Sequence, residues 1–138
     1  MGCDIHLYVE VKTKNGWELY AHPNIRRNYS FFAKLANVQN NGNIKPIANA
    51  RGLPKDISYL VQKEYEYDGS DAHHASFITI DEIEKLQEWL NDKKPFGDEW
   101  MANDLEHGIL RTYLNGNCFY GKLPDWISDS RFVFWFDN

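Results

Sequence analysis

The chain has 138 residues, of which 43% are hydrophobic and 25% charged, so it fits one ordinary folded domain and argues against disorder. Fifteen lysines and arginines against twenty acidic residues give a formal charge of −5, which argues against a non-specific nucleic-acid binder. No apolar run approaches the roughly 20 residues of a membrane span, and the polar N-terminus lacks a signal-peptide core, so we expect a cytoplasmic protein without a membrane partner.

The N-terminal segment predicts a β-hairpin. Residues 3–11 alternate between apolar and polar side chains, the pattern of a strand with one buried face. Asn15-Gly16 follows, and this dipeptide is a strong hairpin signal because both turn positions need positive φ, so we expect positive φ at both residues. We therefore expect a returning strand over 17–21 that ends before Pro23, which has no N–H to donate.

The next segment predicts two short helices. Apolar residues at helical spacing indicate a helix over 29–38, with Asn28 or Ser30 as the N-cap. A second short helix is expected within 54–67. Residues 68–74 are polar and rich in turn formers, which is typical of a surface loop.

A capping signal marks the start of a longer helix. Residues 75–78 predict a short extended piece, and Thr79 and Glu82 then have the spacing of a capping box. The helix that they open shows an apolar stripe over 80–90. A further helix is expected over 98–114.

The C-terminal segment predicts an inner strand. Residues 131–137 carry apolar side chains on both faces, and such a strand needs cover on both sides. Together, the patterns predict a single α+β domain over 1–138. Its small, mostly antiparallel sheet would contain the N-terminal hairpin and the C-terminal inner strand, with helices packed on at least one face.

Several segments of this chain are similar to those of one family. The chain reads MGCDIH at its start, RNYSFFAKLANV and RGLP further on, a histidine-containing loop before SFITIDEIEKL, and RFVFWFDN at its end. This combination resembles a family of uncharacterised proteins from phages, prophages and bacteria, nearly end to end. The resemblance implies a phage-type cytoplasmic protein, and it implies no reaction. The chain departs from the family at His73-His74-Ala75-Ser76, where relatives have a single histidine followed by serine.

Histidines and carboxylates supply the first set of candidate functional residues. Asp4 and His6 are two apart on the first strand, so they point the same way and can bind a ligand or share a metal. Asp71, His73 and His74 form the richest ligand cluster, and with the first pair they would complete a Zn or Mn site if the loop folds over the strand. The alternative is a solvated strand face and a polar surface loop.

Arginines supply the second set. In an acidic protein, Arg27, Arg51 and Arg131 suggest a local anion site, because the guanidinium group matches phosphate or carboxylate in two hydrogen bonds. The alternative is an internal salt bridge, for example from Arg131 to Asp129 or Asp137.

These residues lead to three hypotheses. In the first, the protein binds a phosphate-bearing small nucleotide without a cofactor, and in a phage it would sequester a host immune signal. The expected ligand-binding residues are Asp4, His6, Arg27, Tyr29, Arg51, His73, His74 and Arg131, with Tyr29 as a stacking ring. In the second, a metal-dependent phosphoester hydrolase holds Zn or Mn with Asp4, His6, His73 and His74. In the third, the protein is a module that binds and inhibits a host protein. Enzymatic activity and a homo-oligomeric state stay open.

Overall fold

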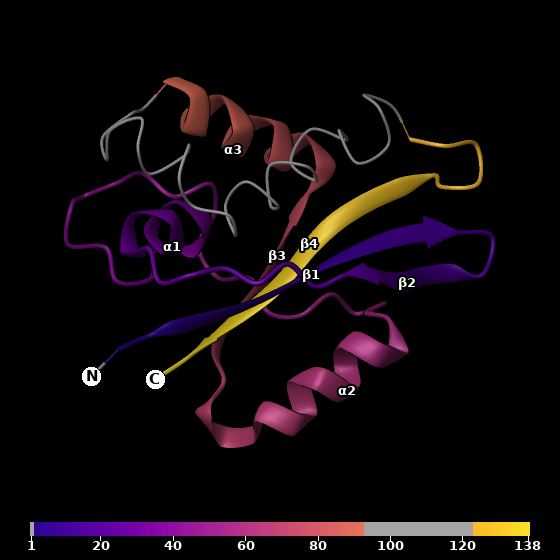
Figure 1. Cartoon of the computed structure of the whole chain (residues 1–138), viewed down its shortest axis with the longest axis horizontal. Coiled ribbons are helices and arrows are strands. Elements are labelled where there is room, and N and C mark those ends of the chain that lie inside the picture. The colour runs from indigo at the N-terminus through magenta and orange to yellow at the C-terminus, as the bar shows by residue number, and fades with distance from the viewer. Residues whose placement is uncertain (1, 93–122) are drawn as a thin grey trace.

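The computed structural model describes residues 2–92 and 123–138. Its elements in chain order are β1 (Asp4–Thr13), β2 (Gly16–Ala21), α1 (Tyr29–Ala36), α2 (Tyr59–Asp68), the 3₁₀ turn η1 (Gly69–Asp71), β3 (His73–Thr79), α3 (Ile80–Asp92) and β4 (Asp129–Asp137). Within these residues the strands form one antiparallel sheet in the order β2-β1-β4-β3 (Figure 1). The predicted α+β class is confirmed, and so are the N-terminal hairpin and the inner position of the C-terminal strand. The helix expected over 98–114 lies outside the described residues.

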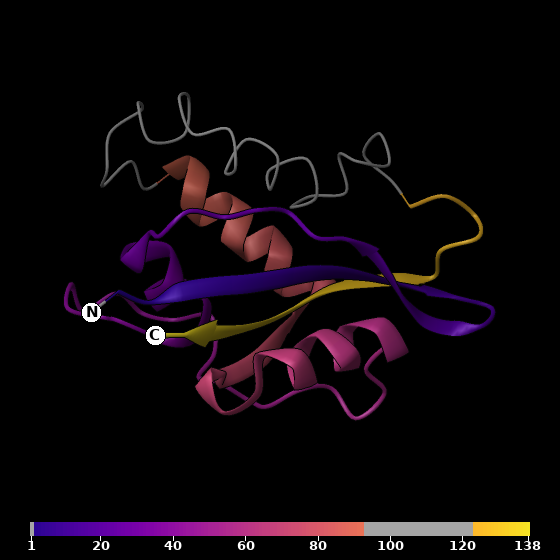
Figure 2. The ribbon, with the colours of Figure 1, turned by 60° about the horizontal axis from the view of Figure 1, so that its bottom comes forward.

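The sheet lies between two layers of helices. Helices α1 and α3 cover one face and α2 covers the other (Figures 1 and 2). The buried side chains of β4 divide in the same way, since Phe132, Phe134 and Phe136 belong to the cluster under α1 and α3, whereas Val133 and Trp135 belong to the cluster under α2. Burying such a side chain contributes roughly 1.5–3 kcal/mol, so β4 is central to the stability of both layers. None of the helices in the described parts is long and apolar enough to cross a membrane.

The hairpin turn differs from the prediction by one residue. Lys14 and Asn15 are the two turn residues, and Gly16 already pairs with Thr13 across the ladder. Gly16 has a φ of 97°, whereas Asn15 is not among the described residues with positive φ, so the expectation that both residues have positive φ is wrong. The positive φ therefore falls on the glycine directly after the two-residue turn, and glycine adopts this conformation without steric cost.

Two helices begin with the caps that the sequence predicts. The side chain of Asn28 accepts a hydrogen bond of 3.0 Å from the backbone N–H of Phe31. Helix α1 ends at Ala36, two residues before the predicted end, and the left-handed residue Asn37 is its C-cap. At the start of α3, the backbone N–H of Thr79 donates to Glu82 Oε1 at 2.9 Å, and the backbone N–H of Glu82 lies 3.4 Å from Thr79 Oγ1. The predicted capping box is therefore confirmed.

The segment predicted as a loop over 68–74 is mostly regular structure. Helix α2 runs through Asp68, η1 follows, and His73 and His74 already belong to β3. Gly69, with a φ of 63°, lets the chain leave the helix, and the pairing of β3 with β4 shifts register after His73. The sequence did not predict this part of the strand, because His73 and His74 lie at its solvent-accessible end and polar residues there resemble a loop.

Candidate functional site

The predicted histidines lie on opposite faces of the sheet. His6 pairs in register with Trp135, and the two rings stack with centroids 6.1 Å apart on the face covered by α2. His73 pairs with Phe136 and stacks on its ring at 6.2 Å, and Phe136 belongs to the cluster under α1 and α3. The sheet therefore separates the two ends of the expected metal site. No group of three or more histidine, cysteine, aspartate or glutamate side chains in residues 2–92 and 123–138 is arranged to hold a metal ion.

His6 is oriented by two carboxylates. Its Nε2 forms a hydrogen bond with Asp137 Oδ2 and lies 3.8 Å from Asp68 Oδ2. Asp68 Oδ2 also accepts a hydrogen bond of 2.5 Å from Trp135 Nε1. Because a carboxylate only accepts, Asp137 places the ring proton of a neutral His6 on Nε2. The negative groups around His6 disfavour the binding of a phosphate at this position.

A stack of rings continues from His6 along this face. The Tyr8 ring lies 5.1 Å from Trp135 and 4.0 Å from the ring of His22. Burial raises the pKa of the Tyr8 hydroxyl, with a further contribution from Glu64 and Asp68, so the phenol stays protonated. His22 is exposed, but partial desolvation against the Tyr8 ring lowers its pKa, which favours the neutral imidazole near pH 7. Tyr8 and His22 therefore supply no cation for an anionic ligand.

Asp4, Arg27 and Tyr29 connect the N-terminal segment with the chain at the start of α1. Arg27 donates to both carboxylate oxygens of Asp4, at 2.6 and 3.2 Å, and these hydrogen bonds are the largest cause of the lowered pKa of Asp4. The Tyr29 hydroxyl accepts a hydrogen bond of 3.1 Å from the backbone N–H of Cys3. Both contacts are internal, and they give these residues a structural role.

Arg51 lies at the free edge of β3. Its guanidinium group donates to both carboxylate oxygens of Glu82 at 2.8 Å and lies over the Phe77 ring at 5.2 Å. The backbone N–H of Arg51 donates to Ser76 Oγ at 3.1 Å. These contacts fasten the loop before α2 to β3 and to the first turn of α3.

Arg131 is buried at the far end of β4. Its Nε donates to Glu10 Oε1 at 2.6 Å, its Nη1 donates to Asp56 Oδ1 at 2.8 Å, and its guanidinium group lies 3.8 Å from the centroid of the Trp17 ring. The internal ion pair was anticipated as an alternative, but its partners are Glu10 and Asp56, whereas Asp129 and Asp137 were expected. Because β1 pairs with β4, Glu10 lies directly opposite Arg131, and only this register reveals the partner.

The eight residues therefore do not line one shared cavity. Arg27, Arg51 and Arg131 each bind a carboxylate of the protein. His74 forms a contact of 2.7 Å between its Nδ1 and that of His73, whose Nε2 in turn lies 2.7 Å from Asn138 Oδ1. Tyr29 alone lines one of the cavities described here, and its volume of about 110 Å³ is below the range of ordinary small-molecule sites.

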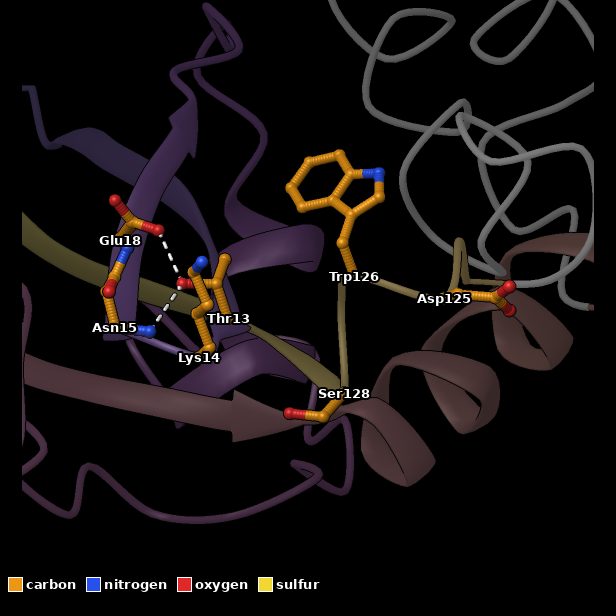
Figure 3. Close-up of a pocket in the computed structure, with 7 residues that line it drawn as sticks. All are labelled: Thr13, Lys14, Asn15, Glu18, Asp125, Trp126 and Ser128. Carbon is orange, nitrogen blue, oxygen red and sulfur yellow. Dashed lines mark hydrogen bonds between the residues drawn. The ribbon is translucent and has the colours of Figure 1, made fainter.

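A larger cavity lies at the other end of the sheet, between the hairpin tip and the chain that leads into β4. Its volume is about 550 Å³, which falls within the usual range for small-molecule sites (Figure 3). The described residues that line it are Thr13, Lys14, Asn15, Glu18, Asp125, Trp126 and Ser128. Sequence reasoning missed all of them as site residues. The sequence feature that could have indicated the site is a tryptophan in a turn-forming run, Pro124-Asp125-Trp126, where an exposed aromatic side chain is available for binding.

The two sides of this cavity differ in chemistry. On the hairpin side, Thr13 Oγ1 donates to Glu18 Oε2 at 2.6 Å and accepts from the backbone N–H of Asn15 at 3.1 Å. The Lys14 ammonium makes no ion pair or hydrogen bond with another described residue. On the other side, the Trp126 side chain is 59% exposed and stands beside the hairpin (Figure 3).

The exposure of Trp126 follows from the burial of its neighbour. Ile127 is buried, and its backbone N–H donates to the carbonyl of Pro124 at 3.0 Å. Ser128 then donates its backbone N–H to the Lys12 carbonyl at 2.9 Å. These contacts fix the backbone of the segment, so the Trp126 indole is held outward, at the cavity, by an ordered turn.

Comparisons with known proteins add no family or function to this geometry. No family model matches the chain, and neither the curated proteins nor the solved structures contain a match. The resemblance to a phage and prophage family therefore stays a prediction.

Proposed function

We propose that the protein binds a small nucleotide that carries phosphate, in the cavity of about 550 Å³ at the hairpin tip. The exposed indole of Trp126 beside the ammonium of Lys14 is the observation that carries this proposal. An aromatic side chain stacks on a nucleobase with about 1–3 kcal/mol per base. A lysine ammonium is a mobile cation that suits a phosphate. The pair thus offers the two contacts that distinguish a nucleotide from a bare anion or a bare ring.

The carboxylates of the cavity limit the charge of the ligand. Glu18 and Asp125 also line it, and both accept hydrogen bonds from sugar hydroxyls or from the exocyclic amines of bases. The two carboxylates repel a highly charged phosphate chain, and a single lysine does not offset both of them. We therefore expect a monophosphate or a phosphodiester to bind more tightly than a triphosphate.

The proposed ligand is the class expected from the sequence, but the proposed residues are new. The sequence placed the phosphate on arginines, and those arginines bind Asp4, Glu82 and Glu10. A phosphate that bound one of these arginines would first have to break its ion pair, which costs free energy. A phosphate that binds Lys14 breaks no such pair. The cavity is therefore the better location for this function.

In a phage or prophage context, we extend the proposal to sequestration of a host nucleotide signal in the host cytoplasm. No observation on the described residues favours the metal-dependent hydrolase, because His6 and His73 lie on opposite faces of the sheet.

The test is a calorimetric and thermal-shift comparison of adenosine, adenosine monophosphate, adenosine triphosphate, the guanine analogues and cyclic dinucleotides. A ligand at about one hundred times its Kd should stabilise the protein by about 2.7 kcal/mol. Trp126→Ala should abolish binding, whereas Trp126→Phe should retain part of it. Lys14→Ala should weaken the monophosphate but not the nucleoside, and Lys14→Arg should restore the difference.

Two results would contradict the proposal. One is the absence of any nucleotide that shifts the melting temperature. The other is tight binding that Trp126→Ala and Lys14→Ala leave unchanged, which would move the site elsewhere. Chromatography of the recovered ligand separates sequestration, where it stays intact, from turnover, where it is converted.

A further inference from the structure

Helix α2 needs only one apolar face to pack on the sheet. Val61 is buried there, and the Tyr65 ring packs edge-on against Trp135 with ring centroids 5.1 Å apart. At about 100° per residue, Val61 and Tyr65 lie on the same side of the helix. Large apolar side chains on the opposite side are therefore not explained by the core.

Three such side chains are present. Tyr59, Leu60 and Tyr67 are 70%, 58% and 88% exposed. At about 100° per residue all three lie on the side away from the sheet, with Tyr67 about two turns beyond Tyr59 and Leu60, and we call these three residues the outer α2 face. Helix α2 forms the outermost layer on its side of the sheet (Figure 2). Single exposed apolar residues are ordinary, but a cluster rich in tyrosine is typical of protein interfaces.

The outer α2 face is surrounded by negative charge. Glu64 and Glu66 lie on α2 beside it, and Asp71 is exposed just after the helix. Lys63 is the only basic residue between positions 59 and 71, and its ammonium binds Glu66 at 3.3 Å. The carboxyl end of the helix adds a partial negative charge of its own.

One contact within the protein already shows what these rings accept. The Lys63 ammonium lies over the Tyr59 ring, 5.4 Å from its centroid. This is the geometry of a cation–π contact, in which the face of the ring attracts a positive charge. Tyr67 is more exposed than Tyr59 and has no such cation among the described residues.

We propose that the outer α2 face is a docking surface for a basic protein segment, whose arginine or lysine side chains stack on Tyr59 and Tyr67 and pair with Glu64 and Glu66. A second copy of this chain fits less well, because a two-fold contact would place the same carboxylates against each other. Nucleic acids and anionic membranes are repelled by the same charges. The proposal does not rest on the nucleotide cavity, which uses other residues.

The test is fluorescence polarisation with a labelled peptide of alternating arginine and leucine. The matched control peptide has citrulline, the uncharged analogue, in place of each arginine. We expect the arginine peptide to bind at least about tenfold more tightly than the citrulline peptide at about 0.15 M salt. The double variant Tyr59→Ser/Tyr67→Ser should weaken the arginine peptide by about tenfold, because it removes two ring contacts.

Two further variants keep the test decisive. Trp126→Ser removes an exposed aromatic outside α2, so it should leave peptide binding unchanged while it abolishes nucleotide binding. Glu64→Gln/Glu66→Gln retains both tyrosines and should weaken the peptide by a similar factor, with a smaller dependence on salt. This second variant decides the question if the tyrosine variant does not fold, which its melting curve will show.

Three results would overturn the proposal. The first is that the arginine peptide binds no better than the citrulline peptide. The second is that the arginine peptide binds equally well after both tyrosines are replaced, which would show that charge alone is responsible. The third is a concentration-dependent dimer in sedimentation that Tyr67→Ser abolishes, which would make the occupant a second copy of the chain.

Discussion

His6 of the first strand and Asp137 of the last strand are joined by a hydrogen bond across 131 positions of the chain. Asp68 is the last residue of α2, and its Oδ2 lies 3.8 Å from the same His6 nitrogen. The start of β1, the end of β4 and the end of α2 therefore meet at one imidazole. The two chain termini lie side by side (Figure 1). This contact makes the N-terminal and C-terminal strands depend on each other.

A double-mutant cycle should measure that dependence. His6→Ala and Asp137→Ala are each expected to lower the free energy of unfolding by about 1–3 kcal/mol, because a charge-assisted hydrogen bond is lost. Their effects should be non-additive by about 1 kcal/mol in urea titrations. As a control, His6→Ala and Asp129→Ala should add, since Asp129 lies at the opposite end of β4. Strict additivity of the first pair would contradict the assigned contact.

The buried pair of Glu10 and Arg131 gives a second prediction. Arg131→Met leaves the Glu10 carboxylate buried without its cation, so we expect a loss of about 3–5 kcal/mol in the free energy of unfolding. Glu10→Leu/Arg131→Met removes both charges and should be less destabilised than Arg131→Met alone. Urea titration of the three proteins checks this order, and a double variant less stable than the single one would argue against it.

The pH dependence of stability should carry a contribution from His22. Partial desolvation against the Tyr8 ring lowers its pKa in the folded protein below the ordinary value of about 6.5 that applies to the unfolded chain. The unfolded state therefore binds more protons below that value, and stability should fall as the pH is lowered from about 6.5 through the folded pKa. His22→Phe keeps a ring against Tyr8 and should reduce this fall. An unchanged slope between neutral and mildly acidic pH in the variant would count against the assignment.

Replacing Arg51 should change the stability of the protein without changing nucleotide binding. Its two hydrogen bonds to Glu82 connect the loop before α2 with α3, so Arg51→Ala should lower the free energy of unfolding by up to about 1 kcal/mol, the upper range for a pair with this exposure. The variant should bind nucleotide as the wild type does, whereas Lys14→Ala should not. Loss of nucleotide binding in Arg51→Ala at unchanged stability would restore the arginine to the site.

Much of the fold follows from local patterns. Alternation over residues 3–11 produced β1, apolar side chains on both faces produced an inner β4, and the spacing of Thr79 and Glu82 placed the start of α3. These patterns work because a strand or a helix presents its faces at a fixed period, so burial leaves a visible trace in the sequence. The prediction was wrong where a polar segment, His73 and His74, is drawn into a strand by a neighbour far along the chain.

The candidate site was far less accessible to sequence reasoning. Amino-acid types alone identified arginines, histidines and carboxylates as reactive groups, and that information holds in any fold. Whether Arg131 meets a ligand or Glu10 depends on the register of β1 against β4, and whether His6 meets His73 depends on the face that each strand position takes. The residues at the cavity, Lys14 and Trp126, come together only because the antiparallel pairing places the start of β4 beside the end of β1. The sequence alone thus determined the periodic elements and the available chemistry. Only the tertiary structure decided the partners, because contacts between distant residues depend on strand order and register, which no local pattern contains.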